Sequence, residues 1–170
     1  IPASTDILVI ERNDASKKVT FVNLTKMPHG MASFHDSSVT LDMSTGVWTH
    51  ISNPANTLYA ATDFTRLTFA GDTLTIDVGS DGDYMMNIGL SFGGTAGDSY
   101  ELGLFKNNVQ IDNPTMERTT GQTDVGYMGL PIYVDGLVAG DDIKIMLRNT
   151  ANNDDATVIA VSWTMFRLHL

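Results

Sequence analysis

The stretch Gly82-Asp83-Tyr84-Met85-Met86-Asn87-Ile88-Gly89-Leu90-Ser91-Phe92 is the clearest alternating run in the chain. Successive side chains of a β-strand point to opposite faces of a sheet. One face therefore carries five large apolar side chains, namely Tyr84, Met86, Ile88, Leu90 and Phe92. The opposite face is smaller and more polar, with Met85, Asn87, Gly89 and Ser91. This pattern predicts a central strand of a β-sandwich with one face in the core.

Short apolar runs separated by Gly, Pro, Asn, Asp and Ser recur on both sides of this stretch. No segment shows a sustained helical period with a cap, so we expect almost no helix. This spacing of runs favours a sandwich or barrel. The predicted strands are 32–35, 39–41, 47–51, 66–70, 74–78, 100–106, 109–111, 125–130, 132–134 and 143–147.

The connections between these runs carry recognisable turn residues. Asn107-Asn108 predicts a tight hairpin turn, because Asn tolerates positive φ better than most residues. Pro131 has no backbone N–H and favours an edge strand or a bulge. Loops are predicted over 53–63, 93–98, 113–123 and 149–155.

The first 30 residues are predicted to be a separate arm and linker, followed by one domain over residues 31–170. The β-branched runs 6–10 and 18–22 flank a turn-rich segment and predict a small hairpin. Residues 23–30 contain Pro and Gly and favour a linker. A lone hairpin is marginally stable in water, so it must pack on the domain, on another copy or on a partner.

The last run, 156–170, is nearly uninterrupted, but its alternation changes phase near Met165. Trp163 and Met165 share one parity, whereas Phe166, Leu168 and Leu170 share the other. A β-bulge near Met165 would reconcile the two sets, and so would a strand buried on both faces. An apolar C-terminus also indicates that this end lies in a core or an interface.

Composition restricts the partners of the protein. The chain has 170 residues, a net charge of -10 and no Cys. Nucleic acid is disfavoured as a partner, because neutralising phosphates requires clustered Lys and Arg. No apolar run is long enough to cross a bilayer, and the first residues do not resemble a signal peptide. The absence of Cys is consistent with synthesis in a cytosol.

The residues do not indicate catalysis, a cofactor or a metal, so we expect a non-enzymatic protein. The spacing Gly-x-Ser-x-Gly occurs once, at Gly89-Leu90-Ser91-Phe92-Gly93, but it lies inside the alternating run and not at a turn from a strand into a helix. His29 and His35 could bind a metal together, but histidines in turns are the commoner explanation. The pairs around Asp81 and Asp83, Asp141-Asp142 and Asp154-Asp155 could supply calcium ligands, yet Asp is also a standard turn residue.

Several aromatic residues could form a sugar-binding surface if loops gathered them at one end of the domain. These are Trp48, Tyr59, Tyr127 and Tyr133. Core packing is the more common role of such residues. Tyr59, in the long polar loop, is the best candidate for a receptor contact.

Three segments together resemble a known family. They are the Gly82-Asp83-Tyr84 entry into an alternating strand, the Leu137-Val138-Ala139-Gly140-Asp141-Asp142-Ile143 segment and the apolar C-terminal strand. They are similar to the globular heads of complement and tumour-necrosis-factor-like proteins, and more closely to phage virion proteins that share that jelly roll. Unlike the cellular members, the chain shows no collagen-like repeat and no Cys.

This resemblance implies an all-β jelly-roll β-sandwich of about ten antiparallel strands, preceded by the short hairpin arm. It also implies a homotrimer whose interface is lined by the alternating strand and the C-terminal strand. The predicted trimer-interface residues are Tyr84, Met85, Asn87, Trp163, Met165, Phe166, Leu168 and Leu170. A thick monomeric sandwich is the alternative.

The function implied by the resemblance is that of a capsid decoration (cement or head-fibre) protein on a phage virion, assembled in the host cytoplasm. The arm would attach it to another virion protein, such as the major capsid protein or a tail component. The predicted attachment residues are Ile7, Val9, Val19 and Phe21. The alternative is a receptor-binding head of a tail fibre that recognises host surface polysaccharide.

Overall fold

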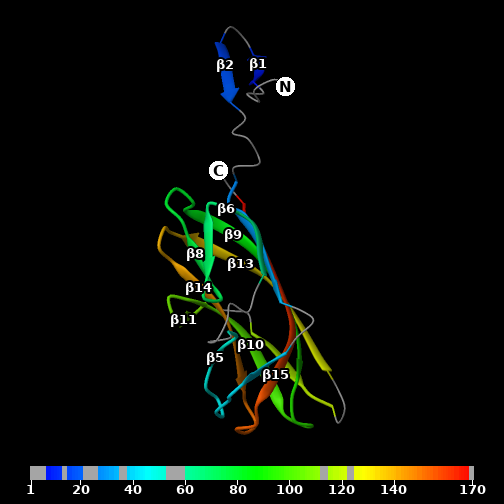
Figure 1. Cartoon of the computed structure of the whole chain (residues 1–170). Coiled ribbons are helices and arrows are strands. Elements are labelled where there is room, and N and C mark those ends of the chain that lie inside the picture. The colour runs from blue at the N-terminus through cyan, green and yellow to red at the C-terminus, as the bar shows by residue number, and fades with distance from the viewer. Residues whose placement is uncertain are drawn as a thin grey trace.

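The computed structural model describes residues 7–12, 15–20, 27–34, 38–52, 60–111, 115–121 and 125–168. These residues contain strands and turns but no helix, and the strands of the main domain form two antiparallel sheets (Figure 1). The all-β sandwich expected from the sequence is therefore confirmed.

The first sheet has six strands and contains the alternating run. Its order is β13 (Val125–Leu137), β9 (Gly82–Gly93), β15 (Ala156–Arg167), β3 (His29–Phe34) and β6 (Ala60–Thr65), and β4 (Val39–Leu41) also pairs with β15. The long strand β9 lies between β13 and β15, which places the alternating run in the interior of the sheet.

The second sheet has seven strands, several of them short. Its order is β11 (Val109–Gln110), β10 (Ser99–Lys106), β14 (Asp142–Asn149), β8 (Thr73–Ile76) and β7 (Leu67–Ala70). In addition, β12 (Met116–Thr119) pairs with β10, and β5 (Thr49–His50) pairs with β14.

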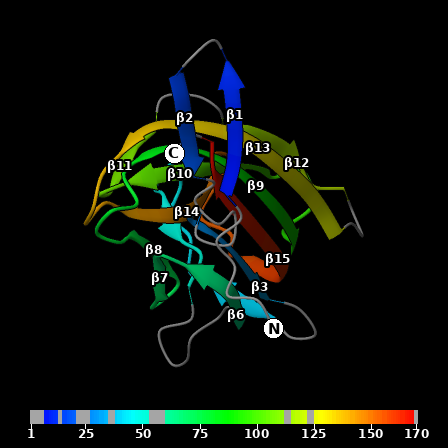
Figure 2. The same ribbon diagram turned by 90° about the horizontal axis from the view of Figure 1, so that it is seen from above.

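A further hairpin precedes the sandwich. It consists of β1 (Ile7–Arg12) and β2 (Ala15–Thr20), which run antiparallel in Figure 2. The hairpin expected in this region is confirmed, with strands that extend further into the turn-rich segment than the sequence indicates. Among the described residues, β1 and β2 pair with each other and with neither sheet of the sandwich.

The core lies between the inner faces of the two sheets. All five residues expected on the buried face of β9 are buried: Tyr84, Met86, Ile88, Leu90 and Phe92. Leu102, Leu104, Ile145 and Leu147 meet them from the second sheet. Trp163 is fully buried in the same cluster and packs edge-on against Phe69, with ring centroids 5.8 Å apart.

Strand β15 differs from the sequence-based expectation. The register shift lies between Val158 and Ala160, and there is none near Met165. Alternation continues through Met165, which is buried, to Phe166, which points out of the sheet. The prediction of a bulge near Met165 is therefore wrong. It failed because the outer face of this strand also carries a large apolar residue, and hydrophobicity alone cannot separate the two faces there.

Two predicted loops contain strands. The loop expected over 113–123 includes β12, and the loop expected over 53–63 ends in β6. Two other local predictions are confirmed: Pro131 lies on β13, the edge strand of its sheet, and Asn107 and Asn108 have positive φ values of 51° and 65° in the turn that joins β10 to β11. The linker expected over 23–30 contains the start of β3, and the strand expected over 47–51 is limited to Thr49–His50.

Candidate functional site

The outer face of the six-stranded sheet is the surface that the core does not use. We define the outer face by residues that alternate with the buried ones on four neighbouring strands. They are His29, Met31 and Ser33 of β3; Ala160, Ser162, Thr164 and Phe166 of β15; Met85, Asn87, Gly89 and Ser91 of β9; and Tyr127, Gly129, Pro131 and Tyr133 of β13.

Strand register arranges this outer face in rows across the sheet. His29, Phe166, Met85 and Tyr133 form one row, and Met31, Thr164, Asn87 and Pro131 form the next. Ser33, Ser162, Gly89 and Gly129 form a third row, made only of small residues.

None of these fifteen residues is Asp, Glu, Lys or Arg, although the chain contains 30 such residues. Asp83, which has the same parity as Met85 on β9, lies at the end of the set. Four of its large side chains are substantially exposed: Met31 at 43%, Phe166 at 45%, Tyr133 at 51% and Tyr127 at 65%. Single exposed apolar residues are common on protein surfaces, whereas a contiguous patch rimmed by polar residues marks an interaction site.

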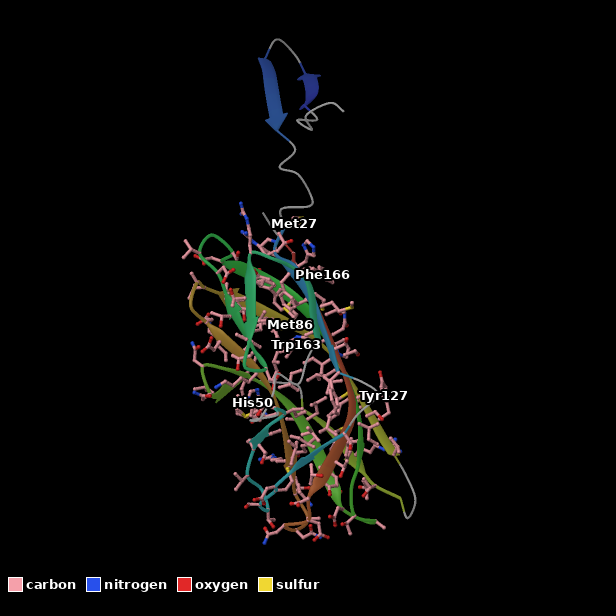
Figure 3. The ribbon with its side chains drawn as sticks, in the orientation of Figure 1. Met27, His50, Met86, Tyr127, Trp163 and Phe166 are labelled. Atoms are coloured by element: carbon pink, nitrogen blue, oxygen red, sulfur yellow. The ribbon has the colours of Figure 1, made fainter. Side chains whose placement is uncertain are left out.

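The structure divides the predicted interface residues between two environments (Figure 3). Tyr84, Trp163 and Met165 are at most 2% exposed and lie in the core between the sheets. Neighbouring residues of a strand point to opposite faces, so these three cannot share a surface with Met85 and Phe166. They have no exposed surface to offer a partner, and the candidate surface is narrower than the sequence predicts.

The other predicted site residues lie in several parts of the structure or outside the described residues. Met85, Asn87 and Phe166 lie on the outer face. Leu168 is half-buried, and its backbone N–H donates to the Asp83 carbonyl at 2.8 Å. Ile7 and Val9 belong to β1, and Val19 belongs to β2. Leu170, Phe21 and Tyr59 fall outside the described residues.

The sequence analysis assigned no role to Met31 and Gly129 of the outer face, and it named Tyr133 as a candidate for a sugar-binding surface and not for a subunit contact. A usable signal was present on β13, where alternation from Val125 places Tyr127, Gly129, Pro131 and Tyr133 on one side. The pairing of Gly129 with Gly89 could not be found without the register of β13 on β9.

Tyr133 is held in place at one end of the outer face. Its hydroxyl donates to Asp83 Oδ2 at 2.9 Å, and the other oxygen of Asp83 accepts from the backbone N–H of Gly136 at 3.0 Å. The hydrogen bond to Asp83 is the main reason that the pKa of Tyr133 is raised. The phenol therefore stays protonated at neutral pH and adds no charge to this face.

The described histidines are engaged in structural hydrogen bonds. The Nδ1 atom of His29 lies 2.6 Å from the Met27 carbonyl, and Nε2 of His50 lies 3.0 Å from the Asp72 carbonyl. Burial lowers the pKa of His50, which keeps it neutral near pH 7. Residue His35, proposed as a metal partner of His29, lies outside the described residues.

The acidic pairs act mainly in turns. Asp81 accepts from the backbone N–H of Ala139 at 2.8 Å, and Asp141 accepts from that of Val138 at 2.9 Å. Asp141 also forms an ion pair with Lys106 at 2.8 Å. In the described part of the chain, no three His, Cys, Asp or Glu side chains are grouped as a metal site would require.

Two of the concave regions on the surface of the described residues are relevant to a binding site. A groove of about 390 Å³ opens between the β10–β11 turn and β13, with Val109, Ile111 and Val134 as its apolar lining and Lys106 and Asp135 among its polar residues. A smaller trough of about 280 Å³ lies on the outer face, over Gly89 and Gly129. No described segment forms a helix long and apolar enough to cross a membrane.

Comparison with known proteins gives information about the fold. No family model and no curated sequence matches the chain. Among solved structures, PRD1 vertex protein P5 is similar with a TM-score of 0.53 and 16% identity, over 99% of this chain and 85% of that one. The globular domain of zebrafish complement 1qA has a TM-score of 0.52 and 10% identity, over 84% and 98%.

A third similar structure is the Eiger TNF of S. frugiperda, with a TM-score of 0.51 and 14% identity over 84% of this chain and 94% of that one. At such identities the likeness concerns the fold, and it agrees with the two antiparallel sheets described above. The chain therefore has the jelly-roll fold of tumour-necrosis-factor-like and complement globular domains.

Proposed function

We propose that this protein is a non-enzymatic structural protein of a phage virion, which forms a homotrimer and decorates the capsid. In this proposal the jelly roll is the exposed body. It begins before residue 31, the boundary expected from the sequence, because His29 and Gly30 already pair with β15. The arm that precedes Pro28 attaches it to another virion protein.

The observation that carries the proposal is the uncharged outer face. A chain with a net charge of -10 repels other copies of itself wherever its acidic residues face each other. The fifteen residues that define the outer face include no acidic or basic side chain, and they expose Met31, Tyr127 and Phe166. Asp83, at the end of this face, accepts hydrogen bonds from Tyr133 and Gly136. Such a surface suits contact between identical subunits, because burying it strands no unpaired charge.

The likeness to PRD1 vertex protein P5 supports the virion role. That protein is by its name a vertex component, and the likeness covers 99% of the present chain. Among the described residues, β1 and β2 pair only with each other. This supports the role of the arm, because an isolated two-stranded hairpin is marginally stable and its edges are templates for a partner strand.

Removal of the arm tests the proposal. The deletion should end at Lys26, because the Pro28 carbonyl accepts from the Arg167 backbone N–H at 2.9 Å and belongs to the sandwich. We expect the truncated protein to remain a folded trimer that no longer co-sediments with virus particles assembled without the full-length chain. The full-length protein is the control and should bind.

Unchanged particle binding by the truncated protein would refute attachment through the arm. Absence of the chain from purified virions would refute the virion role. A glycan array separates decoration from the tail-fibre alternative, because specific binding to a bacterial polysaccharide would favour the receptor-binding head.

A further inference from the structure

The row of small residues on the outer face forms a trough. Contacts within the subunit do not account for all of the small residues that line it. Gly89 of β9 and Gly129 of β13 are direct partners in the register, and Ser162 of β15 faces Gly89 from the other side. Tyr127 and Pro131 are among the residues that enclose the trough, which has a volume of about 280 Å³. Glycine in a strand interior weakens the strand and often marks close approach of another group.

One of the two glycines has a reason within the subunit. A Cβ atom on Gly89 would lie 2.7 Å from Ser162 Oγ and 3.1 Å from Tyr127 Oη. Both distances are shorter than ordinary contacts, so a side chain at position 89 would displace Ser162 or Tyr127 from its present position.

Gly129 has no such reason. A Cβ atom there would lie 3.6 Å from the nearest atom, Tyr127 Cε1, which is an ordinary van der Waals contact. Gly129 is not among the residues with positive φ, so its backbone does not favour glycine either. The empty space above Gly129 is therefore a feature of the surface.

We propose that the trough over Gly89 and Gly129 is the seat for an apolar side chain of a neighbouring copy of this chain. The proposal rests on the homotrimer of the proposed function and adds the place where subunits interlock. Tyr127, which is 65% exposed and lies against both glycine positions, forms the aromatic wall of the seat.

A second copy fits this trough better than other occupants do. None of the residues that line the trough is Asp, Glu, Lys or Arg, so the trough offers no partner to a charged ligand, and a second copy can approach it without a like-charge contact there. The volume is slightly below the range of roughly 300–1,000 Å³ that is typical of small-molecule sites. The same outer face also presents Met31 and Phe166, exposed apolar side chains that a neighbour could supply.

Filling the trough tests the inference. Gly129→Val adds a branched side chain that suits a strand, and its Cβ atom makes only ordinary contacts in the isolated subunit. We expect a folded subunit whose melting temperature, in its dissociated form, equals or exceeds that of the parent. We expect the concentration at which the trimer dissociates to rise at least tenfold in a dilution series followed by mass photometry.

Gly93→Val is the matched control. Gly93 lies at the end of β9, the strand that carries Gly89, and a Cβ atom there would meet nothing within 4 Å. This variant should dissociate at the same concentration as the parent. Equal weakening by both substitutions would overturn the inference, because the effect would not be specific to the trough.

A thiol-labelling experiment gives a second readout that needs only a small side chain. The chain has no Cys, so Gly129→Cys and Gly93→Cys each introduce a single thiol. In the trimer, the thiol at position 129 should react at least tenfold more slowly with a maleimide than after dilution to subunits. The thiol at position 93 should react equally fast in both states.

The results separate this inference from the proposed function. The parent and Gly129→Val could both be trimeric, with a thiol at position 129 that reacts freely in the trimer. That result would refute the assignment of the trough to a subunit contact and would leave the proposed trimer intact. A monomeric parent would overturn both. A monomeric parent that bound neutral oligosaccharides, with loss of binding in Gly129→Val, would assign the trough to a glycan instead.

Discussion

Met85 and Met86 are adjacent in β9 but face opposite sides of the sheet, so the same substitution should have different effects at the two positions. Met86 is fully buried between the sheets, whereas Met85 is half-buried on the outer face. We predict that Met86→Asp unfolds the subunit and that Met85→Asp leaves it folded but dissociates the trimer.

The magnitude for Met86→Asp follows from two costs. Loss of a buried Met side chain and the resulting cavity cost about 2–5 kcal/mol. An Asp side chain in this apolar site must be protonated at pH 7, roughly three pH units above its ordinary pKa, which costs about 4 kcal/mol. The combined cost is comparable with the total stability of a domain, about 5–15 kcal/mol.

At Met85 the new carboxylate reaches water in the separate subunit, so its effect on unfolding should stay within about 1 kcal/mol. In the trimer, several carboxylates would be buried at an apolar contact, which is strongly unfavourable. Far-UV circular dichroism with urea denaturation measures the first effect, and light scattering coupled to gel filtration measures the second.

The pH dependence of Met86→Asp adds an internal check. Burial raises the pKa of the new carboxyl in the folded state, so its unfavourable contribution is smallest below about pH 4 and grows as the pH rises above that value. Stability relative to the parent should therefore improve on acidification. A Met86→Asp variant that is as stable as the parent at pH 7, or a Met85→Asp variant that unfolds, would refute the assignment of the two faces.

Two further residues give independent predictions. Tyr84 is fully buried, and its hydroxyl donates to the Ser80 carbonyl at 2.6 Å; burial is the main reason that its pKa is raised to about 12. Because the folded pKa lies above the unfolded value of about 10, the associated stability is present below pH 10 and is lost as the pH rises toward 12. Tyr84→Phe should weaken that alkaline loss and cost about 1–2 kcal/mol at neutral pH in urea denaturation; an unchanged alkaline profile would contradict this. Asn149 is fully buried and connects Asp98, Ala151 and Asp154 through hydrogen bonds of 2.9–3.1 Å. Asn149→Ala should cost about 2–4 kcal/mol in the same assay, with the exposed Thr150→Ala as the matched control, and equal stabilities would show that the network is dispensable.

The burial of the side chains in the alternating run could be predicted from the sequence, because hydrophobicity and strand geometry both have a period of two there. Tyr84 to Phe92 alternates without interruption, and the inward set is buried as expected. Asn107 and Asn108 were similarly informative, since their tolerance of positive φ is a local property that does not depend on the rest of the fold.

Strand β15 was harder because both of its faces carry apolar residues. Its register shift at Val158 and Ala160 places Trp163 and Met165 inside and Phe166 outside. From hydrophobicity alone these three residues look equivalent, which is why the predicted interface mixed core and surface positions. Only pairing with β9 and β3 assigns each residue to a face.

Strand β12 could not be predicted for the opposite reason. Met116-Glu117-Arg118-Thr119 is mostly polar and has no alternation, and it is extended because it pairs with β10. The trough also depends on long-range register. Gly89 and Gly129 are forty residues apart in the sequence, and no local signal indicates that they face each other.

The central claim is that identical subunits associate through the uncharged outer face, and the native mass tests it most directly. Light scattering of the purified full-length chain at micromolar concentration should give three times the 18.4 kDa mass of one chain. Met85→Asp should lower that mass to one chain. A parent protein that remains at 18.4 kDa across the concentration range would contradict the account.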